Sequence, residues 1–92
     1  MIVFNTRFLY PVSAVQLQEQ QGILPREFLQ TVEALRPFLE KEKAYGDVCA
    51  TNVTSPRGRN LVVYYRKLYA TDSGFVIEIL DAEVVQPLAQ VA

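Results

Sequence analysis

The residues of this chain best suited to chemistry are arginines and tyrosines that alternate in its C-terminal half. Two arginines flank a glycine in a short turn, and further basic and tyrosyl side chains follow: Arg57, Arg59, Tyr64, Tyr65, Arg66, Lys67 and Tyr69. Arginines pair with phosphates and tyrosines stack on bases, so this combination is typical of a platform for single-stranded nucleic acid. The bland alternative is a solubilising hairpin tip above ordinary strand aromatics.

Several kinds of catalysis need side chains that this chain lacks. It has no histidine, which excludes Ser-His-Asp and Cys-His mechanisms. Cys49 is the only cysteine, so neither a disulfide nor a cysteine-based zinc site can form within one chain. Ser55–Arg59 has one glycine and no Gly-Lys-Ser/Thr ending, unlike a phosphate loop. We therefore predict that the protein is not an enzyme and needs no metal or cofactor.

Length and composition indicate one small domain. The 92 residues, half of them hydrophobic, carry a formal net charge of -1, which disfavours a general affinity for nucleic acid. No apolar run reaches the roughly 18 residues of a membrane-spanning helix, and the N-terminus lacks signal-peptide features. We expect a single α+β domain over residues 1–92, with 87–92 a loosely held tail, in the cytoplasm and without membrane association.

A predicted hairpin organises the rest of the chain. Residues 60–70 and 75–80 are rich in β-branched and aromatic side chains, and Thr-Asp-Ser-Gly between them has hairpin length. Residues 47–55 read as a more polar strand, joined to the hairpin by a turn that contains proline and glycine. These three strands form a predicted meander.

The register of the hairpin has two candidate solutions. In one, Arg66 lies opposite Glu78, and a slip of one residue places Lys67 there instead. Because Arg66 and Lys67 are adjacent, they point to opposite faces. One of them must therefore lie on the helix-covered face, its stem packed and its charge at the rim.

The N-terminal part of the chain predicts a strand and a short helix. Residues 2–10 alternate between two faces with the period of a strand, and Pro11 ends that pattern. Ser13 and Gly22 suit the start and the end of a short helix over residues 14–21.

A longer amphipathic segment follows. Pro25 suits its first position, and Pro37 within it predicts a kink or a division into two helices, with Gly46 as the final cap. Residues 81–86 fit either a short helix or an added strand.

Together these elements predict an α+β fold of order β-α-α-β-β-β: a four-stranded antiparallel sheet with one or two helices packed on one face. A single helical layer covers only one face, yet the predicted strands carry apolar residues on both. The surplus is covered by another protein or a second copy, or by the C-terminal segment folding back. The apolar residues of the two faces are Val62, Tyr64, Leu68, Val76 and Leu80, and Leu61, Val63, Tyr65, Phe75, Ile77 and Ile79.

Four acidic residues on predicted exposed positions form another candidate surface: Glu33, Glu40, Glu42 and Asp47. They could imitate the phosphate charges of a nucleic acid and block a basic groove. An ordinary solvated helix surface explains them as well.

In length, lack of histidine and β-α-α-β-β-β layout, the chain resembles small phage-encoded inhibitors, among them anti-CRISPR proteins that act on type I surveillance complexes. This likeness of overall plan implies stoichiometric binding to a Cas subunit, which hinders target DNA recognition without turnover. The alternative is a small nucleic-acid-binding or regulatory module, and a self-associating homodimer is a third reading. We predict contacts through Arg57, Arg59, Tyr64 and Arg66, and expect reversal of both turn arginines to abolish binding with little effect on thermal stability.

Overall fold

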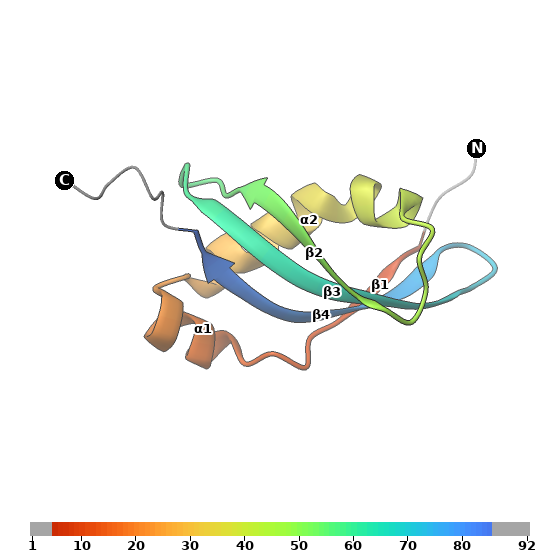
Figure 1. Ribbon diagram of the computed structural model, residues 1–92, viewed down its shortest axis with the longest axis horizontal. Coiled ribbons are helices and arrows are strands. Elements are labelled where there is room, and N and C mark those ends of the chain that lie inside the picture. The colour runs from red at the N-terminus through yellow and green to blue at the C-terminus, as the bar shows by residue number, and fades with distance from the viewer. Residues whose placement is uncertain (1–4, 86–92) are drawn as a thin grey trace.

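The computed structural model describes residues 5–85, which form two helices and a four-stranded sheet (Figure 1). The predicted class and element order, β-α-α-β-β-β, are confirmed. The start of the predicted first strand, residue 86 and the predicted tail lie outside the described residues. In chain order the elements are β1 (Arg7–Leu9), α1 (Ala14–Gln21), α2 (Pro25–Lys41), β2 (Val48–Thr54), β3 (Asn60–Ala70) and β4 (Phe75–Val84).

The sheet is mixed, in the order β1-β4-β3-β2. β3 pairs antiparallel with β2 and β4, whereas β1 runs parallel to β4, which corrects the antiparallel partner expected for it. The backbone N–H of Asn5, just before β1, donates to the carbonyl of Ser73 at 2.7 Å. A Cβ at Gly74 would stand 2.7 Å from the carbonyl carbon of Asn5, so only glycine permits this approach. The β3–β4 turn thus holds β1 beside β4.

The register of the hairpin places Arg66 opposite Glu78, the first of the two candidate solutions. Two irregularities accompany it. Tyr64 pairs with Asp81 and Tyr65 with Ile79, so Leu80 is an extra residue, as in a β-bulge. Lys67 pairs with Ile77 and Tyr69 with Val76, so Leu68 is a second extra residue. β4 continues to Val84, which makes the segment after Leu80 strand rather than helix.

The caps predicted for α1 are confirmed. The Ser13 hydroxyl accepts a hydrogen bond from the backbone N–H of Gln16 at 3.3 Å, and Gly22 adopts the left-handed conformation with φ of 69°. A residue with a side chain would be strained there, so glycine suits the turn between the helices.

α2 is a single helix of 17 residues, and Pro37 does not divide it. Pro37 is exposed, so the helix loses one hydrogen bond on its solvent side, where water can replace it. Gly46 is not the final cap, because the helix ends at Lys41 and the Gly46 N–H donates instead to the carbonyl of Lys67 at 2.9 Å. Neither helix within residues 5–85 is long and apolar enough to cross a membrane.

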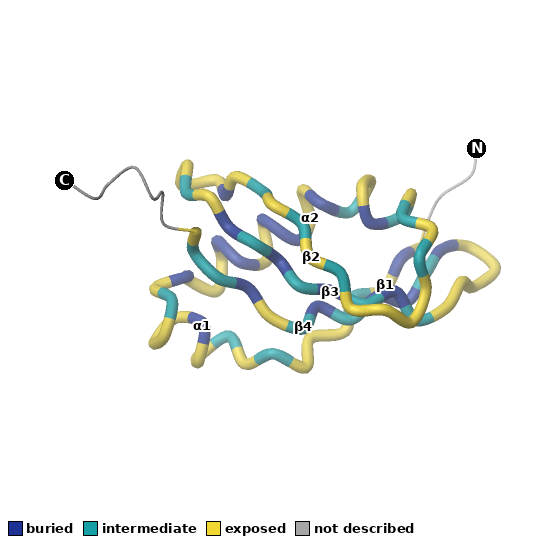
Figure 2. Tube along the Cα trace, viewed as in Figure 1, coloured by how far each residue is buried: buried dark blue, intermediate teal, exposed yellow. Residues whose placement is uncertain are grey.

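The helices cover one face of the sheet. α2 crosses behind the strands and α1 lies beside β4 (Figure 1). Figure 2 shows buried and half-buried positions alternating along β3, as a strand covered on one side requires. The core between helices and sheet consists of Leu17, Ile23, Phe28, Val32, Leu35, Leu39, Leu61, Val63, Tyr65, Ile77, Ile79 and Ala82.

Lys67 is buried in this layer with 1% of its surface exposed. Its ammonium donates to the carbonyls of Glu40 at 3.1 Å and Glu42 at 2.5 Å, and it lies 3.6 Å from the centroid of the Phe75 ring. Burial lowers the pKa of this ammonium, and the charges of Glu42 and Glu40 act against that shift. The expectation that this charge lies at the rim of the sheet is wrong. The ammonium is buried and caps the C-terminal end of α2.

We expect Lys67→Met to lower the free energy of unfolding by about 1–3 kcal/mol, because two carbonyls at the end of α2 lose their donor while the side-chain volume is kept. Urea unfolding measures this, with Lys43→Met on the exposed loop after α2 as a matched control. If the Lys67 variant were as stable as the Lys43 variant, the cap would contribute nothing to the fold.

Candidate protein-interaction face

The sheet face turned away from the helices has no covering element among the described residues. We call it the open face. Along β3 its residues alternate with the buried ones beneath the helices, and most are half-buried. On the two central strands the open face includes Val62, Tyr64, Arg66, Leu68 and Tyr69 of β3, and Val76, Glu78, Leu80, Asp81 and Glu83 of β4.

Apolar side chains reach across the open face from edge to edge. Leu9 of β1 is 38% exposed and Val48 of β2 is 60% exposed. Tyr64, Leu68 and Leu80 lie between them on the central strands. A solvated face of an antiparallel sheet alternates more cleanly with polar residues, so this composition is typical of a surface that another protein covers.

Two cross-strand interactions order the polar part of the open face. The Arg66 guanidinium donates to the Glu78 carboxylate from Nη2 at 2.8 Å and from Nε at 3.0 Å. The Tyr64 hydroxyl donates to Glu83, and this hydrogen bond to a carboxylate raises the pKa of the tyrosine. Asp81 is exposed opposite Tyr64. Because Arg66 neutralises only Glu78, the β4 side of the open face is left acidic.

The four residues predicted to bind a partner do not form one surface. Tyr64 and Arg66 lie two residues apart on the open face. Arg57 is exposed at the tip of the β2–β3 turn, whereas Arg59 turns toward the helices. Their role as contacts stays a prediction.

Arg59 belongs to an ionic cluster that fastens the N-terminal turn of α2 to the β2–β3 turn. It donates from Nε to Glu27 at 3.1 Å and from Nη2 to the Gly22 carbonyl at 2.8 Å, and its ion pair with Glu27 measures 2.5 Å. The Ser55 hydroxyl donates to the same carboxylate at 2.7 Å. Glu27 is 3% exposed, yet its pKa is lowered, because the hydrogen bond from Arg59 outweighs the effect of burial.

This cluster was not predicted from the sequence. The signal available was an acid in the first turn of an amphipathic helix, at a position adjoining its apolar stripe. The partner could not be identified from local spacing, since Arg59 lies 32 residues away in the chain.

The predicted nucleic-acid platform is divided between the two faces of the sheet. Tyr65 is 2% exposed and Lys67 is 1% exposed, both beneath the helices, so neither can meet a base or a phosphate. Arg59 and Arg66 are each paired with a carboxylate. Fewer unpaired cations are therefore available to bind phosphates than the sequence predicts.

Three of the four candidate acids make contacts within the molecule. Glu33 pairs with Arg36 at 2.7 Å. Glu40 accepts a hydrogen bond from Thr6, and the Glu42 carboxylate accepts from the backbone N–H groups of the two residues after it. These acids thus take part in fixing α2 and its ends.

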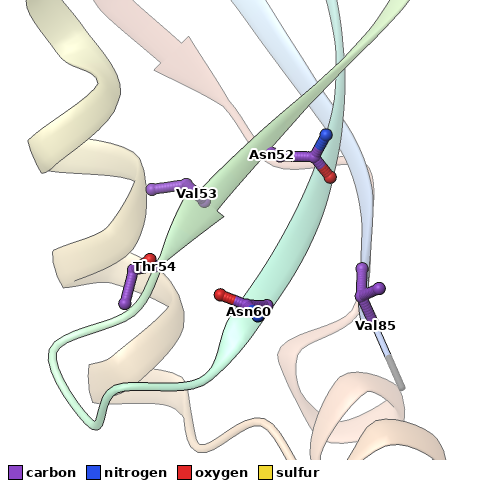
Figure 3. Close-up of a pocket in the computed structure, with 5 residues that line it drawn as sticks. All are labelled: Asn52, Val53, Thr54, Asn60 and Val85. Carbon is purple, nitrogen blue, oxygen red and sulfur yellow. The ribbon is translucent and has the colours of Figure 1, made fainter. Parts of the chain in front are cut away.

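A shallow hollow of about 360 Å³ lies at the end of the sheet near the β2–β3 turn (Figure 3). It is lined by Asn52, Val53, Thr54, Asn60 and Val85, none of which is ionisable. Within residues 5–85, no three acidic or cysteine side chains gather where a metal ion could bind.

Comparison of the chain with protein-family models, with curated proteins and with solved structures gives no match.

The structure changes the expectation for the turn arginines. Arg59→Glu brings a second carboxylate to the buried Glu27 and should lower the thermal midpoint by about 10 °C or more. Arg57→Glu, at the exposed turn tip, should change it by less than about 3 °C. Thermal unfolding of both single variants checks this. Equal midpoints would mean that the Arg59 cluster does not hold α2.

The Glu27 cluster also predicts a pH dependence. Because the folded pKa of Glu27 lies below its usual value of 4.5, its contribution to stability is complete above pH 4.5 and declines as the pH falls through the lower folded value. Glu27→Gln should therefore cost about 1–3 kcal/mol near neutral pH and progressively less in acid. Urea unfolding over a pH series measures the difference. Glu33→Gln, in an exposed ion pair, serves as the control with a smaller cost throughout.

Proposed function

We propose that this protein acts without turnover, by stoichiometric association of its open face with a larger protein or ribonucleoprotein complex. The observation that carries the proposal is the composition of that face. Leu9, Tyr64, Leu68 and Leu80 present apolar surface on three strands, on the side of the sheet opposite the helices. Apolar anchors surrounded by ordered polar groups are the usual anatomy of a protein-binding patch.

The charges on the open face define the chemistry of the partner. Asp81 and Glu83 lie beside Tyr64, and the structure gives neither a cationic partner among the described residues. A matching surface would bring an apolar patch against Tyr64 and Leu80 and a lysine or arginine against the acids. Such a pairing favours a basic protein surface over a nucleic-acid backbone, whose phosphates the acids would repel.

The likeness in plan to anti-CRISPR proteins extends this proposal to a particular partner. In that reading the open face binds a Cas subunit of a type I surveillance complex at a basic surface that otherwise meets target DNA. Binding would then exclude the DNA by occupancy, one inhibitor for each site, with no substrate consumed.

Tyr64→Ala combined with Asp81→Lys should weaken partner binding about 30-fold or more, because it removes the central aromatic anchor and reverses the adjacent charge. The partner is captured from the native host with immobilised protein, and its affinity and stoichiometry are then measured by calorimetry. A purified type I surveillance complex with labelled target DNA tests the Cas reading directly, through loss of DNA binding at one inhibitor per site.

The matched control is Val15→Ala combined with Gln18→Lys on α1, where both side chains are exposed away from the open face. This control should bind like the unmodified protein. Full affinity in the Tyr64 and Asp81 variant would reject the open face as the contact surface. Tight binding to a short oligonucleotide that falls steeply with salt would instead support the nucleic-acid alternative.

A further inference from the structure

We propose that a second copy of this chain adds its β2 to the β2 of the first. The two strands run antiparallel about a two-fold axis at Thr51, and the two four-stranded sheets join into one. This inference rests on an edge of the sheet and on one flank of α2, and it does not depend on the partner proposed for the open face.

The two edges of the sheet are built differently. β1 has only three residues, includes the charged Arg7 and is followed closely by Pro11, features that discourage another strand from adding there. β2 has seven residues, Val-Cys-Ala-Thr-Asn-Val-Thr, with neither charge nor proline. Its register with β3 runs from Val48 to Thr54 without a bulge. β2 therefore presents a regular row of N–H and C=O groups that a further strand can pair.

The sequence of β2 suits pairing with an identical strand. About an axis at Thr51, each threonine meets its own symmetry mate, Cys49 meets Val53 of the second copy, and Ala50 meets Asn52. In a two-fold contact, a charged residue near the axis lies close to the same residue of the second copy, and the two like charges repel. β2 has no charged residue, so this repulsion does not arise. All seven residues of β2 are paired in this register.

α2 adds apolar surface on the same side. Glu27 is bound to Arg59 at the β2–β3 turn, and Phe38 lies eleven residues further on, close to three full turns, on the same flank of the helix. The opposite flank carries Arg36, which donates to the Thr6 carbonyl just before β1. Phe38, on the flank away from Arg36, is 49% exposed. The two-fold axis brings these flanks of the two copies together.

The proposed dimer keeps both open faces available. Residues directly opposite in an antiparallel pair share one face, so the helices of both copies lie on one side of the joined sheet. The two open faces then form one surface on the other side. A complex with repeated subunits could be engaged twice, which strengthens binding through effective concentration.

Charge introduced on β2 tests the pairing. In Ala50→Lys with Asn52→Lys, each new ammonium lies opposite a new ammonium of the second copy. Sedimentation equilibrium should give twice the chain mass for the unmodified protein and the mass of one chain for this variant. Ala50→Glu with Asn52→Glu should also sediment as one chain, and an equimolar mixture of the two variants should restore the dimer. Gln18→Lys with Gln20→Lys on α1 is the charge-matched control and should stay dimeric.

A covalent cross-link tests the register. Val53→Cys places a second thiol four residues from Cys49, about 13 Å away along the same strand and beyond disulfide reach. In the proposed dimer, the thiol of Cys49 lies opposite the thiol introduced at position 53 of the second copy. Mild oxidation should therefore yield a disulfide-linked dimer on a non-reducing gel, whereas the unmodified chain, with Cys49 opposite Val53, should give none.

Three results would each overturn the proposal. The first is an unmodified protein that sediments as one chain over the whole concentration series. The second is a dimer that survives the lysine pair on β2, and the third is the absence of the Cys49 to Val53→Cys cross-link. Circular dichroism of each variant verifies that the fold is kept. Because Val53 packs toward the helices, the cross-linked dimer retains its open face, so partner binding can be measured separately.

Discussion

The fold depends on two buried charges that fix the two ends of α2 to the sheet. Glu27 in the first turn is held by Arg59 and Ser55, and Lys67 on β3 donates to the last carbonyls of the helix. An acid at the positive end of a helix and a cation at its negative end both complement the helix dipole. Each also has hydrogen-bond partners within the protein, which a buried charge requires. Together they define where α2 lies along the strands.

This arrangement determines which surface is left for function. Because α2 is fixed at both ends on one side of the sheet, the other side receives no helix from the described residues, although its strands are apolar enough to pack against one. Lys67 and Arg66 are neighbours on β3 with opposite roles, one beneath the helix and one on the open face. A strand that alternates in this way separates residues that maintain the fold from residues that can meet a partner.

Elements could be predicted from the sequence where the signal was local. Ser13 and Gly22 marked the ends of α1, and the order of helices and strands followed from hydrophobic periodicity. The parallel β1–β4 pair could not be predicted, because it depends on a backbone contact of Asn5 with the turn before Gly74. Of the candidate contact residues, Tyr64 and Arg66 were correctly predicted to lie within a strand. The pattern could not reveal that Arg59 is committed to an acid 32 residues away.

The polar groups of the open face would suit the binding role proposed for it. Tyr64 is held by Glu83, and Arg66 by Glu78, before any partner arrives. Long side chains normally lose rotamer freedom on binding, at a cost of about 0.5–1.5 kcal/mol each. Cross-strand pairs have already restricted these side chains during folding. A small domain can thus present a rigid, partly apolar surface whose side chains lose little further rotamer freedom on binding.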